Sequence, residues 1–236
     1  MPTFNRRMFI SQAIAYFRRQ DYAAKELIVV DDGDDCVADL VPGDPTIRYI
    51  RLEEKQPLGA KRNLACSLAR GPLICHWDDD DWMASWRIGY QVRQLLETRA
   101  DVGGLDRLFF YDPFSGQSYR YRYPKQKTTL LAGGSLCFSK HFWEQNPFPE
   151  VNQGEDTGFV WSERPKTLLA HKEDAFYVAL IHPHNTNPRY PTRKRWSTYP
   201  TDKLEARLGS DLAFYRRLPN TISSRPLRSG GRQSVN

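Results

Sequence analysis

Pro72-Leu-Ile-Cys-His-Trp77 runs directly into Asp78-Asp79-Asp80-Asp81, and Trp82-Met-Ala-Ser-Trp86 follows. Runs of like charge normally lie in solvated segments, but this run has apolar and aromatic flanks. The flanks are typical of a buried strand before the aspartates and of the start of a packed helix after them. Four carboxylates at one strand end repel one another, and a divalent cation would relieve that repulsion by taking their hard oxygens as ligands. The stretch therefore predicts a metal site, with an acidic helix-capping turn as the alternative.

Composition and charge fit one globular domain with an anionic partner. The chain has 236 residues, of which 40% are hydrophobic, enough for a single α/β domain with a large core. Its net charge of +6 favours a phosphate, a nucleotide, a nucleic acid or an acidic membrane surface, without choosing among them. The four cysteines, at positions 36, 66, 75 and 137, form no metal-type pair and indicate a reducing compartment.

The sequence offers no sign of a membrane span or a secretory leader. No stretch is long and apolar enough to cross a bilayer. Met1–Arg7 lacks the apolar core of a secretory signal. We therefore expect a cytoplasmic protein, with a peripheral contact at the inner membrane face left open.

Helical and β-type patterns alternate over the first hundred residues. We predict helices over Phe9–Arg19, residues 57–70 and Ile88–Leu96, and strands over Leu27–Val30, Ile47–Leu52 and Leu73–Trp77. This alternation is typical of a doubly wound α/β sheet. Ligands of such sheets bind at the carboxyl ends of the strands, where Asp31–Asp32 and Asp78–Asp81 would both lie.

The ends of the chain and its second half are less regular. A sheet that begins with a helix at Phe9 needs a strand before it, and only Met1–Phe4 is available; we expect a short first strand or a truncated or misassigned start. The second half predicts a hairpin of residues 105–111 and 119–123, a strand over 176–182 and a helix over 201–217. The polar, basic tail from residue 219 to residue 236 is expected to be disordered.

Six segments, taken together, resemble one known family. They are Met1-Pro-Thr-Phe-Asn-Arg6, Leu27-Ile-Val-Val-Asp-Asp-Gly33, Leu58-Gly-Ala-Lys-Arg-Asn63, Asp78–Trp82, Gly154-Glu-Asp156 and His182-Pro-His-Asn-Thr186. Their order over residues 1–190 resembles the family 2 glycosyltransferases of the GT-A fold. The resemblance implies one Rossmann-like α/β/α domain with a mixed central sheet, and inverting transfer of a sugar from a nucleotide diphosphate to a hydroxyl.

The resemblance also implies a division of the chain. Residues 1–200 would form the GT-A catalytic domain, with a nucleotide-binding half at 1–105 and an acceptor-binding half at 106–200. A C-terminal helix would occupy 201–218, and the tail 219–236.

The donor nucleotide is implied to lie against the first half. Thr3 and Asp31 match positions that hold the base, usually uracil, and Asn5 is grouped with them. A carboxylate can accept from the imide N–H of uracil, so a UDP-sugar is expected. Lys61 and Arg62 match the basic segment beside the base and phosphates. The alternatives are a turn residue for Asp31 and a solvated helix face for one of the two basic residues.

The aspartate run resembles the metal-binding D-x-D triplet of the family. The resemblance implies that Asp80 binds Mg²⁺ or Mn²⁺, that Asp78 reaches the ribose or a metal-bound water, and that Asp79 belongs to the nucleotide site. The cation would stabilise the leaving diphosphate. His182 would complete the metal shell or contact the diphosphate, with a strand-end histidine satisfied by backbone as the alternative.

The acceptor side of the reaction is implied at Gly154-Glu155-Asp156. Asp156 would be the general base, and Glu155 would bind the acceptor or orient Asp156. The alternative is that Asp156 caps a helix over residues 157–162. Gly134 and Ser135 fit a loop whose small residues let the backbone approach the donor sugar. Trp161 is expected to help shape that pocket.

The partners expected are a nucleotide-sugar donor and a carbohydrate or lipid-linked acceptor, and no nucleic acid. The basic, aromatic segment 188–200 predicts a lid over the diphosphate, with a solvated loop or an anionic-lipid contact as alternatives. Three other functions stay open: a GT-A-like nucleotidyltransferase, for which Thr3–Arg7 lacks a glycine-rich phosphate loop; a binding module for nucleotide or acidic polymer; and an inactive family member. The donor sugar, the acceptor and the oligomeric state are open.

Overall fold

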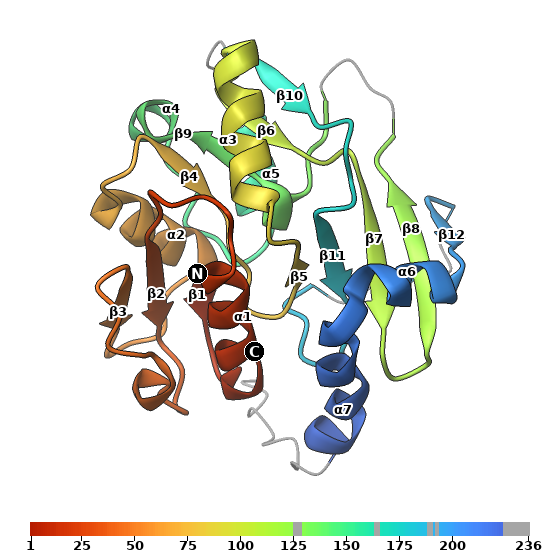
Figure 1. Cartoon of the computed structure of the whole chain (residues 1–236). Coiled ribbons are helices and arrows are strands. Elements are labelled where there is room, and N and C mark those ends of the chain that lie inside the picture. Colours follow the sequence, from red (N-terminus) through yellow and green to blue (C-terminus); the bar gives the residue numbers. More distant parts are fainter. Residues whose placement is uncertain (125–128, 163–165, 188–190, 192–193, 224–236) are drawn as a thin grey trace, which may run out of the picture.

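The computed structural model of the chain describes residues 1–124, 129–162, 166–187, 191 and 194–223. Its described strands are divided among three hydrogen-bonded sheets, with helices packed against them (Figure 1). Parallel and antiparallel pairs both occur. The expected α/β class with mixed strand pairing is therefore confirmed.

The first sheet is parallel and carries the N-terminal segment. Its order is β1 (Pro2–Thr3), β2 (Leu27–Asp31) and β3 (Ile47–Arg51). β2 is buried along its whole length, as its run of leucine, isoleucine and valine favours in a strand covered on both faces. The helices α1 (Arg7–Arg18) and α2 (Leu58–Leu68) follow β1 and β3 in the chain, and α2 packs against β1 and β2.

The second sheet is mixed and holds the strand that leads into the aspartates. Its order is β10 (Leu168–Ala170), β6 (Val102–Gly104), β9 (Cys137–Ser139) and β4 (Leu73–Cys75). β9 runs antiparallel to both of its neighbours. Helices pack around this sheet: α3 (Arg87–Thr98), α4 (Lys140–Gln145) and α5 (Glu155–Val160).

The third sheet forms the other side of the molecule. Its order is β12 (Trp196–Thr198), β8 (Gln117–Arg122), β7 (Arg107–Asp112), β11 (Tyr177–Leu180) and β5 (Trp82–Met83). β7 and β8 form the predicted hairpin, with Asp112 opposite Gln117 at its turn. The helices α6 (Thr201–Leu208) and α7 (Leu212–Ser223) lie beside this sheet (Figure 1).

Three short 3₁₀ turns complete the described elements: η1 (Ala38–Leu40), η2 (Gly133–Ser135) and η3 (Gly209–Asp211). The last of them divides the helix that was expected over residues 201–217. Gly209 has a φ of 56°, a left-handed conformation that glycine adopts readily. The second helix then continues past Pro219 to Ser223, where buried Leu218 and Ile222 hold it against the core. The prediction of disorder is therefore wrong for residues 219–223; residues 224–236 lie outside the described part.

The segment after the aspartates also differs from the expectation. Trp82 and Met83 form a strand instead of opening a helix, and they pair antiparallel with Val178 and Tyr177 of β11. Both side chains are buried, and α3 begins only at Arg87. Strand pairing from a distant part of the chain outweighs the local helical pattern here.

Arg87 joins the second sheet to the loop at Gly134. Its guanidinium is fully buried and donates to the carbonyl oxygens of His76 and Gly134, each at 2.9 Å. It also donates to Oε1 of Gln91 at 2.9 Å and lies 5.4 Å from the ring centroid of Trp77. This one side chain fixes the residues just before the aspartates against the Gly134 loop.

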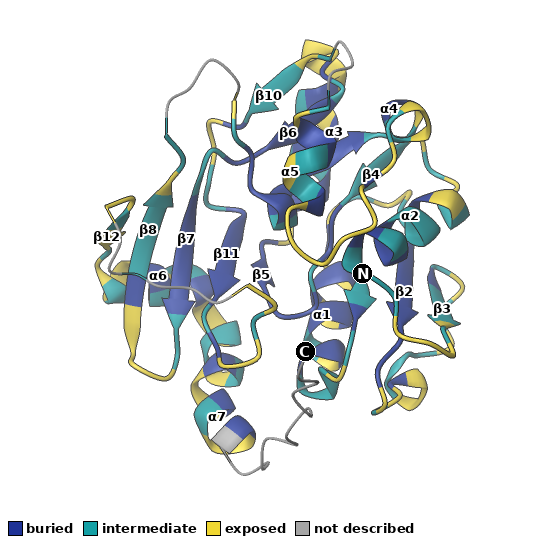
Figure 2. Ribbon diagram, turned by 180° about the vertical axis from the view of Figure 1, so that it is seen from behind, coloured by how far each residue is buried: buried dark blue, intermediate teal, exposed yellow. Residues whose placement is uncertain are grey.

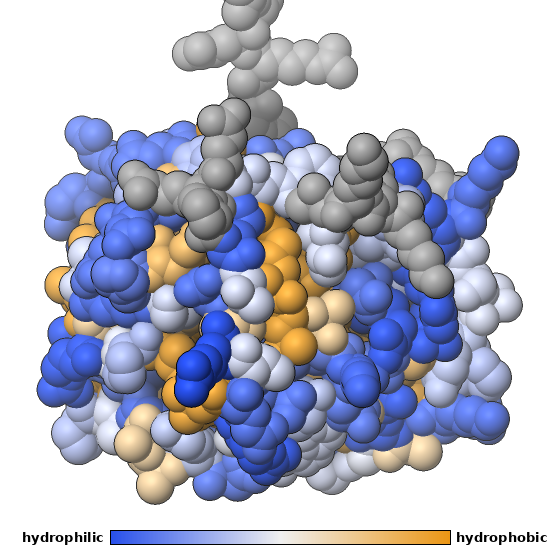
Figure 3. All heavy atoms as spheres, turned by 90° about the horizontal axis from the view of Figure 1, so that it is seen from above, coloured by the Kyte–Doolittle hydropathy of each residue, from blue (hydrophilic) through white to orange (hydrophobic). Residues whose placement is uncertain are grey.

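Burial and surface character follow this layout. Buried residues run along β2, β7, β11 and the inner face of α1, while exposed residues concentrate in loops and on outer helix faces (Figure 2). The face drawn in Figure 3 is largely hydrophilic, with smaller hydrophobic patches between the polar side chains. Among the described helices, none combines the length and apolar character that crossing a bilayer needs.

His171 introduces a pH-sensitive element into the core. Its side chain is buried between the rings of Tyr90 and Phe176, and its Nε2 accepts from Gln91 at 3.2 Å. Burial, with Arg87 adding to it, lowers the pKa of His171 from 6.5 to about 4. Because the folded protein favours the neutral ring, its contribution is full above pH 6.5 and is lost as the pH falls from 6.5 through 4.

We predict that this ring contributes about 3 kcal/mol to the pH dependence of unfolding. Urea unfolding of the wild type and of His171→Gln at a series of pH values between neutral and 4 measures it. The difference in unfolding free energy between the two proteins should shrink by about that amount as the pH falls. His141→Gln, at an exposed position of α4, controls for the substitution itself. A difference that stays constant over this range would contradict the prediction.

Candidate active site

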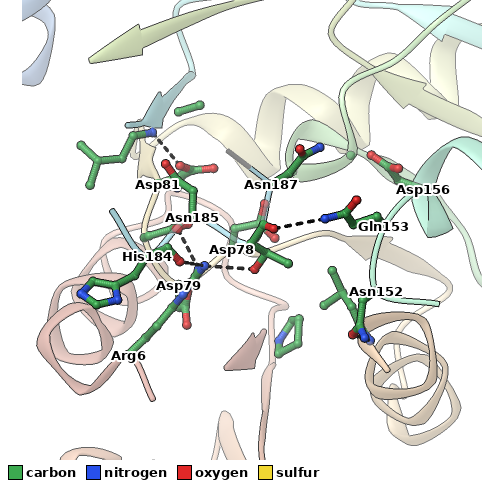
Figure 4. Close-up of a pocket in the computed structure, with 18 of the residues that line it drawn as sticks. Arg6, Asp78, Asp79, Asp81, Asn152, Gln153, Asp156, His184, Asn185 and Asn187 are labelled. Carbon is green, nitrogen blue, oxygen red and sulfur yellow. Dashed lines mark hydrogen bonds and ion pairs between the residues drawn. The ribbon is translucent and has the colours of Figure 1, made fainter. Parts of the chain in front are cut away.

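A large cavity lies between the three sheets, with a volume of about 1770 Å³. Its walls come from the end of β1, the aspartate run, the η2 loop, the start of α5, the loop 184–187 and the inner face of β7, β8 and β12. The carboxyl end of β1 and the aspartates after β4 thus meet at one cavity, as ligand sites in α/β folds require. Figure 4 shows the acidic end of this cavity.

Arg6 lies among the aspartates and was assigned no role from the sequence. Its Nη1 contacts Asp79 Oδ1 at 2.8 Å and Asp80 Oδ2 at 2.7 Å (Figure 4). Its Nη2 donates to the carbonyl oxygen of His184 at 2.8 Å and to Oγ1 of Thr186 at 3.1 Å. The guanidinium therefore neutralises two carboxylates and ties the aspartate run to the loop 184–187. The sequence signal for it was the Arg6–Arg7 pair at the end of the first segment that resembles the family.

The four carboxylates have different surroundings. Asp78 is partly exposed, whereas Asp79, Asp80 and Asp81 are buried. Burial opposes ionisation of Asp80, but Arg6 and His182 outweigh it and hold the pKa of Asp80 below its usual value. Burial raises the pKa of Asp79, and the Oδ2 atom of Asp79 has no hydrogen-bond partner within the described residues.

Asp81 anchors the run to the third sheet. It accepts from the hydroxyl of Tyr177 and from the backbone N–H of Leu180 at 2.8 Å. Burial and the neighbouring Asp80 and Asp78 raise the pKa of Asp81 well above its usual value. Its oxygens are used within the protein, which leaves the first three aspartates for a ligand.

His182 contacts Asp80 and the loop that follows β11. Its Nε2 lies 2.9 Å from Asp80 Oδ2, and its Nδ1 accepts from the backbone N–H of His184 at 3.2 Å. Nδ1 must therefore be unprotonated, and Nε2 carries the proton that it donates to Asp80. With both nitrogens engaged and the side chain fully buried, His182 orients Asp80. That His182 completes a metal shell or contacts the diphosphate stays a prediction.

Asp31 lies behind the cavity and does not line it. Its carboxylate is fully buried and accepts from the N–H groups of Gly33 at 2.9 Å and Val37 at 3.1 Å, and from the hydroxyl of Tyr49 at 2.7 Å. Arg51 lies 3.3 Å away. The loop after β2 and the end of β3 thus supply its partners, which favours the turn alternative; contact of Asp31 with a base stays a prediction.

Thr3 and Asn5 do line the cavity, as the expected base site requires. Asn5 adopts a left-handed φ of 54°, which asparagine tolerates better than most residues. Its Oδ1 accepts from the backbone N–H of Asp35 at 3.0 Å. A Cβ atom on Gly33 would lie 2.5 Å from the backbone nitrogen of Asn5, so only glycine fits against this turn.

Lys61 and Arg62 are both buried, so neither forms a solvated helix face. Lys61 lines the cavity, but its ammonium contacts Asp32 Oδ1 at 2.6 Å and donates to the carbonyl oxygen of Thr3 at 3.0 Å. Arg62 contacts the ring of His76 and lies 3.5 Å from Asp78. The two basic residues therefore brace the first sheet against the aspartate run.

Glu155 and Asp156, at the start of α5, have different surroundings. Glu155 is buried and lies 3.4 Å from Arg62; burial raises the pKa of Glu155, although Arg62 opposes the shift. Asp156 lines the cavity, and its Oδ1 accepts from the backbone N–H of Thr157 at 2.7 Å. The helix cap is Gly154, with a φ of 84°, so the capping alternative for Asp156 is wrong.

The η2 loop brings Asp156 and Asp78 close to each other. A Cβ atom on Gly133 would overlap Asp156 Oδ2, and one on Gly134 would overlap Asp78 Oδ2 and the hydroxyl of Tyr177. The two glycines therefore let the backbone pass between the carboxylates. One carboxylate therefore lies against each of these two consecutive backbone residues at the cavity wall.

Comparison with known proteins identifies the family. A model described as Glycosyl transferase family 2 matches residues 1–152. The chain belongs to that family. It is similar to a Campylobacter jejuni protein named GalNAc(5)-diNAcBac-PP-undecaprenol beta-1,3-glucosyltransferase, with 32% identity over 110 residues that cover 44% of this chain and 36% of that protein. The chain spans less than half the length of the curated relatives it matches.

Two solved structures agree in fold. TarS 1–349 of S. aureus in complex with UDP-GlcNAc has a TM-score of 0.61 at 16% identity, covering 96% of this chain and 75% of that one. The mannosyltransferase PcManGT of Pyrobaculum calidifontis, in complex with GDP-Man and Mn²⁺, has a TM-score of 0.59 at 16% identity, covering 95% and 63%. The GT-A fold expected for the chain is thereby confirmed.

Two predicted residues of this family 2 chain lie outside the cavity. Ser135 is fully buried; its Oγ donates to the Ala132 carbonyl at 2.7 Å and accepts from the N–H of Leu105 at 2.9 Å. Its hydroxyl therefore stabilises the η2 loop and is not directed at a sugar in the cavity. Trp161 follows α5, is 42% exposed and does not line the cavity.

The lid expected over residues 188–200 is described only in part. Lys194, Arg195 and Trp196 line the cavity. Tyr199 packs on Phe109, with ring centroids 4.6 Å apart, and so belongs to the sheet. Arg189, Tyr190 and Arg193 lie outside the described residues.

We predict that Lys61→Met lowers the unfolding free energy by about 3–5 kcal/mol, because Asp32 would stay buried without its cation. Lys55→Met is the control: that exposed ammonium lies 3.9 Å from the ring centroid of Phe4, and its loss should cost about 1 kcal/mol or less. Chemical denaturation measures both. A small loss for Lys61→Met would mean that this ammonium is available to a nucleotide instead.

Proposed function

We propose that this chain carries the catalytic site of a metal-dependent, inverting glycosyltransferase that moves a sugar from a UDP-sugar to an acceptor hydroxyl. The observation that carries the proposal is the pairing of Asp78 and Asp156 across the Gly133–Gly134 backbone at one cavity. Asp78 would act on the donor side of the reaction, and Asp156 on the acceptor side. The cavity, at about 1770 Å³, exceeds the volume usual for a single small ligand, roughly 300–1,000 Å³.

The comparisons support a nucleotide-sugar donor without choosing one. TarS was solved with UDP-GlcNAc and PcManGT with GDP-Man and Mn²⁺. These ligands belong to those proteins, which share 16% identity with this chain. The preference for UDP comes from the resemblance in the first sheet, where Thr3 and Asn5 line the cavity.

The residues of the acidic end suit a hard divalent cation. Asp79 has a buried oxygen without a hydrogen-bond partner in the described residues, and Asp78 is partly exposed to the cavity. Across the described part of the chain, no three His, Cys, Asp or Glu side chains converge as a ready cage. Mg²⁺-type ions that bind phosphates often use only one or two protein carboxylates, so a closed cage is not needed.

Asp78, Asp79 and Asp80 are the residues that would hold the cation. When bound, it would supply Lewis-acid stabilisation to the departing diphosphate. Arg6 occupies the position between Asp79 and Asp80 now, and its hydrogen bonds to residues 184 and 186 make it a second source of positive charge beside the phosphates. His182 keeps Asp80 ionised and oriented.

Asp156 is proposed as the general base. Its Oδ1 is held by the N–H of Thr157, and the side chain lines the cavity, from which an acceptor hydroxyl would reach it. As the acceptor oxygen attacks the anomeric carbon, its proton passes to Asp156. A single displacement of this kind inverts the anomeric centre, with an oxocarbenium-like transition state.

Titration of UDP tests the donor half of the proposal. We expect UDP to bind the wild type with Mn²⁺ and not with chelator, and Asp80→Asn to weaken binding at least about tenfold because a metal ligand is lost. Asp112→Asn, in the hairpin turn, is the control and should bind as the wild type does. Equal binding with Mn²⁺ and with chelator would rule out metal dependence.

The same titration with Mn²⁺ alone tests the place of Arg6. In Arg6→Gln, Asp79 and Asp80 lose their internal counter-charge, so Mn²⁺ without nucleotide should bind about fivefold to tenfold more tightly than in the wild type. Unchanged Mn²⁺ affinity would mean that the cation does not use these carboxylates.

Substitution of the base tests the acceptor half. We expect Asp156→Asn to lower kcat by about 10²–10⁴-fold while the Kd for UDP stays unchanged, because a general base acts only in the chemical step. Release of UDP from a panel of UDP-sugars measures kcat, and titration measures Kd. Asp202→Asn, the same change in the exposed first turn of α6, is the control. A loss of UDP affinity equal to the loss of rate would instead place Asp156 in the donor site.

A further inference from the structure

The cavity continues beyond the acidic end to a wall that the proposed reaction leaves unused. This wall is the cavity side of the third sheet, and we call it the aromatic wall. Its residues are Leu108 and Phe110 of β7, Tyr121 and Tyr123 on or next to β8, and Trp196 of β12. A donor held by the aspartates would occupy only part of the volume of about 1770 Å³, so a second ligand has room here.

The rings of the aromatic wall form one continuous surface. Tyr121 and Trp196 are directly opposite in the β8–β12 pair, with ring centroids 5.2 Å apart. Tyr121 and Tyr123 lie 5.0 Å apart, and Trp196 lies 4.5 Å from Phe110. Tyr121, Tyr123 and Trp196 are only partly buried and line the cavity, so each presents part of its side chain to the cavity.

Strand geometry explains why the wall faces inward. Side chains two residues apart on β8 share a face, so Tyr121 and Tyr123 point the same way. Arg120, between Tyr119 and Tyr121, points to the opposite face and contacts Asp174 at 3.2 Å. A surface of aromatic rings with hydroxyl and N–H groups at its rim suits a ligand with an apolar face and a hydroxylated edge, as a pyranose ring has.

Positive charge adjoins this wall. Lys194 and Arg195 directly precede Trp196, are exposed and line the same cavity. The backbone at Arg195 is fixed because its carbonyl accepts from the N–H of Arg122 at 3.2 Å. The cavity is therefore acidic at the aspartates and basic beside the aromatic wall, and the basic part would attract an anionic group on the second ligand.

We propose that Tyr121, Tyr123 and Trp196, together with Lys194 and Arg195, form the acceptor subsite, and that the acceptor is a glycosyl phosphate. This inference rests on the function proposed above. The sugar ring packs on the aromatic wall and its phosphate meets the two cations. A hydroxyl oxygen of that sugar forms the new bond to the anomeric carbon of the donor. The bond from that carbon to the diphosphate breaks, UDP leaves with the electron pair, and the proton goes to Asp156.

Binding measurements with three probes test the subsite in the presence of UDP and Mn²⁺. The probes are hexose 1-phosphates, the matching methyl glycosides, and hexose 1-phosphates esterified with a decyl chain. We expect the hexose 1-phosphate to bind about fivefold more tightly than the methyl glycoside, because of the charge-assisted contacts. The decyl ester distinguishes a lipid-linked sugar phosphate from a free one. If it binds more tightly than the unesterified hexose 1-phosphate, the acceptor is lipid-linked. If the two bind equally, the acceptor is a free sugar phosphate.

Variants assign the effect to named residues. Lys194→Gln with Arg195→Gln should remove the preference for the phosphate, whereas Lys203→Gln with Arg217→Gln, exposed on α6 and α7, should keep it. Tyr121→Leu should weaken both sugar probes about tenfold by removing a central ring. Tyr22→Leu is the control, since Tyr22 is also partly buried but does not line the cavity. UDP affinity should stay unchanged in every variant.

The outcomes separate this inference from the function on which it rests. Loss of UDP affinity in Tyr121→Leu would mean that the aromatic wall binds the nucleobase of the donor. Equal binding of methyl glycoside and hexose 1-phosphate would mean that the site does not recognise a phosphate. Either result overturns the inference. No hexose 1-phosphate binding to a wild type that still binds UDP also overturns it alone. A wild type that binds no UDP in any condition would instead remove the proposed function, and with it the inference.

Discussion

Neutralisation of four consecutive carboxylates is the constraint on which the rest of the site depends. Each aspartate has a partner from a different part of the chain: Asp78 has Arg62, Asp79 and Asp80 share Arg6, and Asp81 has Tyr177 and the backbone of Leu180. These partners come from α2, the segment after β1, and β11. Because a buried, unpaired carboxylate is costly, the requirement for partners draws the first and third sheets towards the end of β4. The cavity lies where they meet.

The same requirement explains the glycines. Partner residues bring the aspartate run close to the η2 loop and to α5, and no side chain fits between them. Gly133 and Gly134 let the backbone pass between Asp156 and Asp78, while Arg87 donates to the carbonyl oxygens of both Gly134 and His76. Asp78 on the donor side and Asp156 on the acceptor side can then lie on either side of the same stretch of backbone. Each carboxylate has its own set of neighbours.

The sequence predicted which elements form and where the chemistry gathers, but it could not show how the polar groups are satisfied. The hydrophobic run at Leu27–Val30, the hairpin of β7 and β8 and the cavity position of Asp78 and Asp156 follow from local pattern and from the resemblance. Asp31 and Lys61 have the residue types expected of ligand-binding groups, yet their bonds are filled by Val37, Tyr49 and Asp32. Those partners lie elsewhere in the chain, and no pattern of spacing shows that they consume the lone pairs and protons.

Charge is distributed unevenly over the cavity, and this affects which ligand each part of it would bind. The net charge of +6 is not concentrated at the donor end, where Asp78–Asp81, Glu155 and Asp156 gather around Arg6 and Arg62. A diphosphate would be repelled there unless further positive charge arrived with it, which is the physical reason to expect a cation at that end. Lys194 and Arg195 line the same cavity beside Trp196, and no ion pair joins them to the aspartates within the described residues. Their charge is therefore better suited to a second anionic ligand, and the polarity of the cavity would keep the donor and the acceptor from exchanging places.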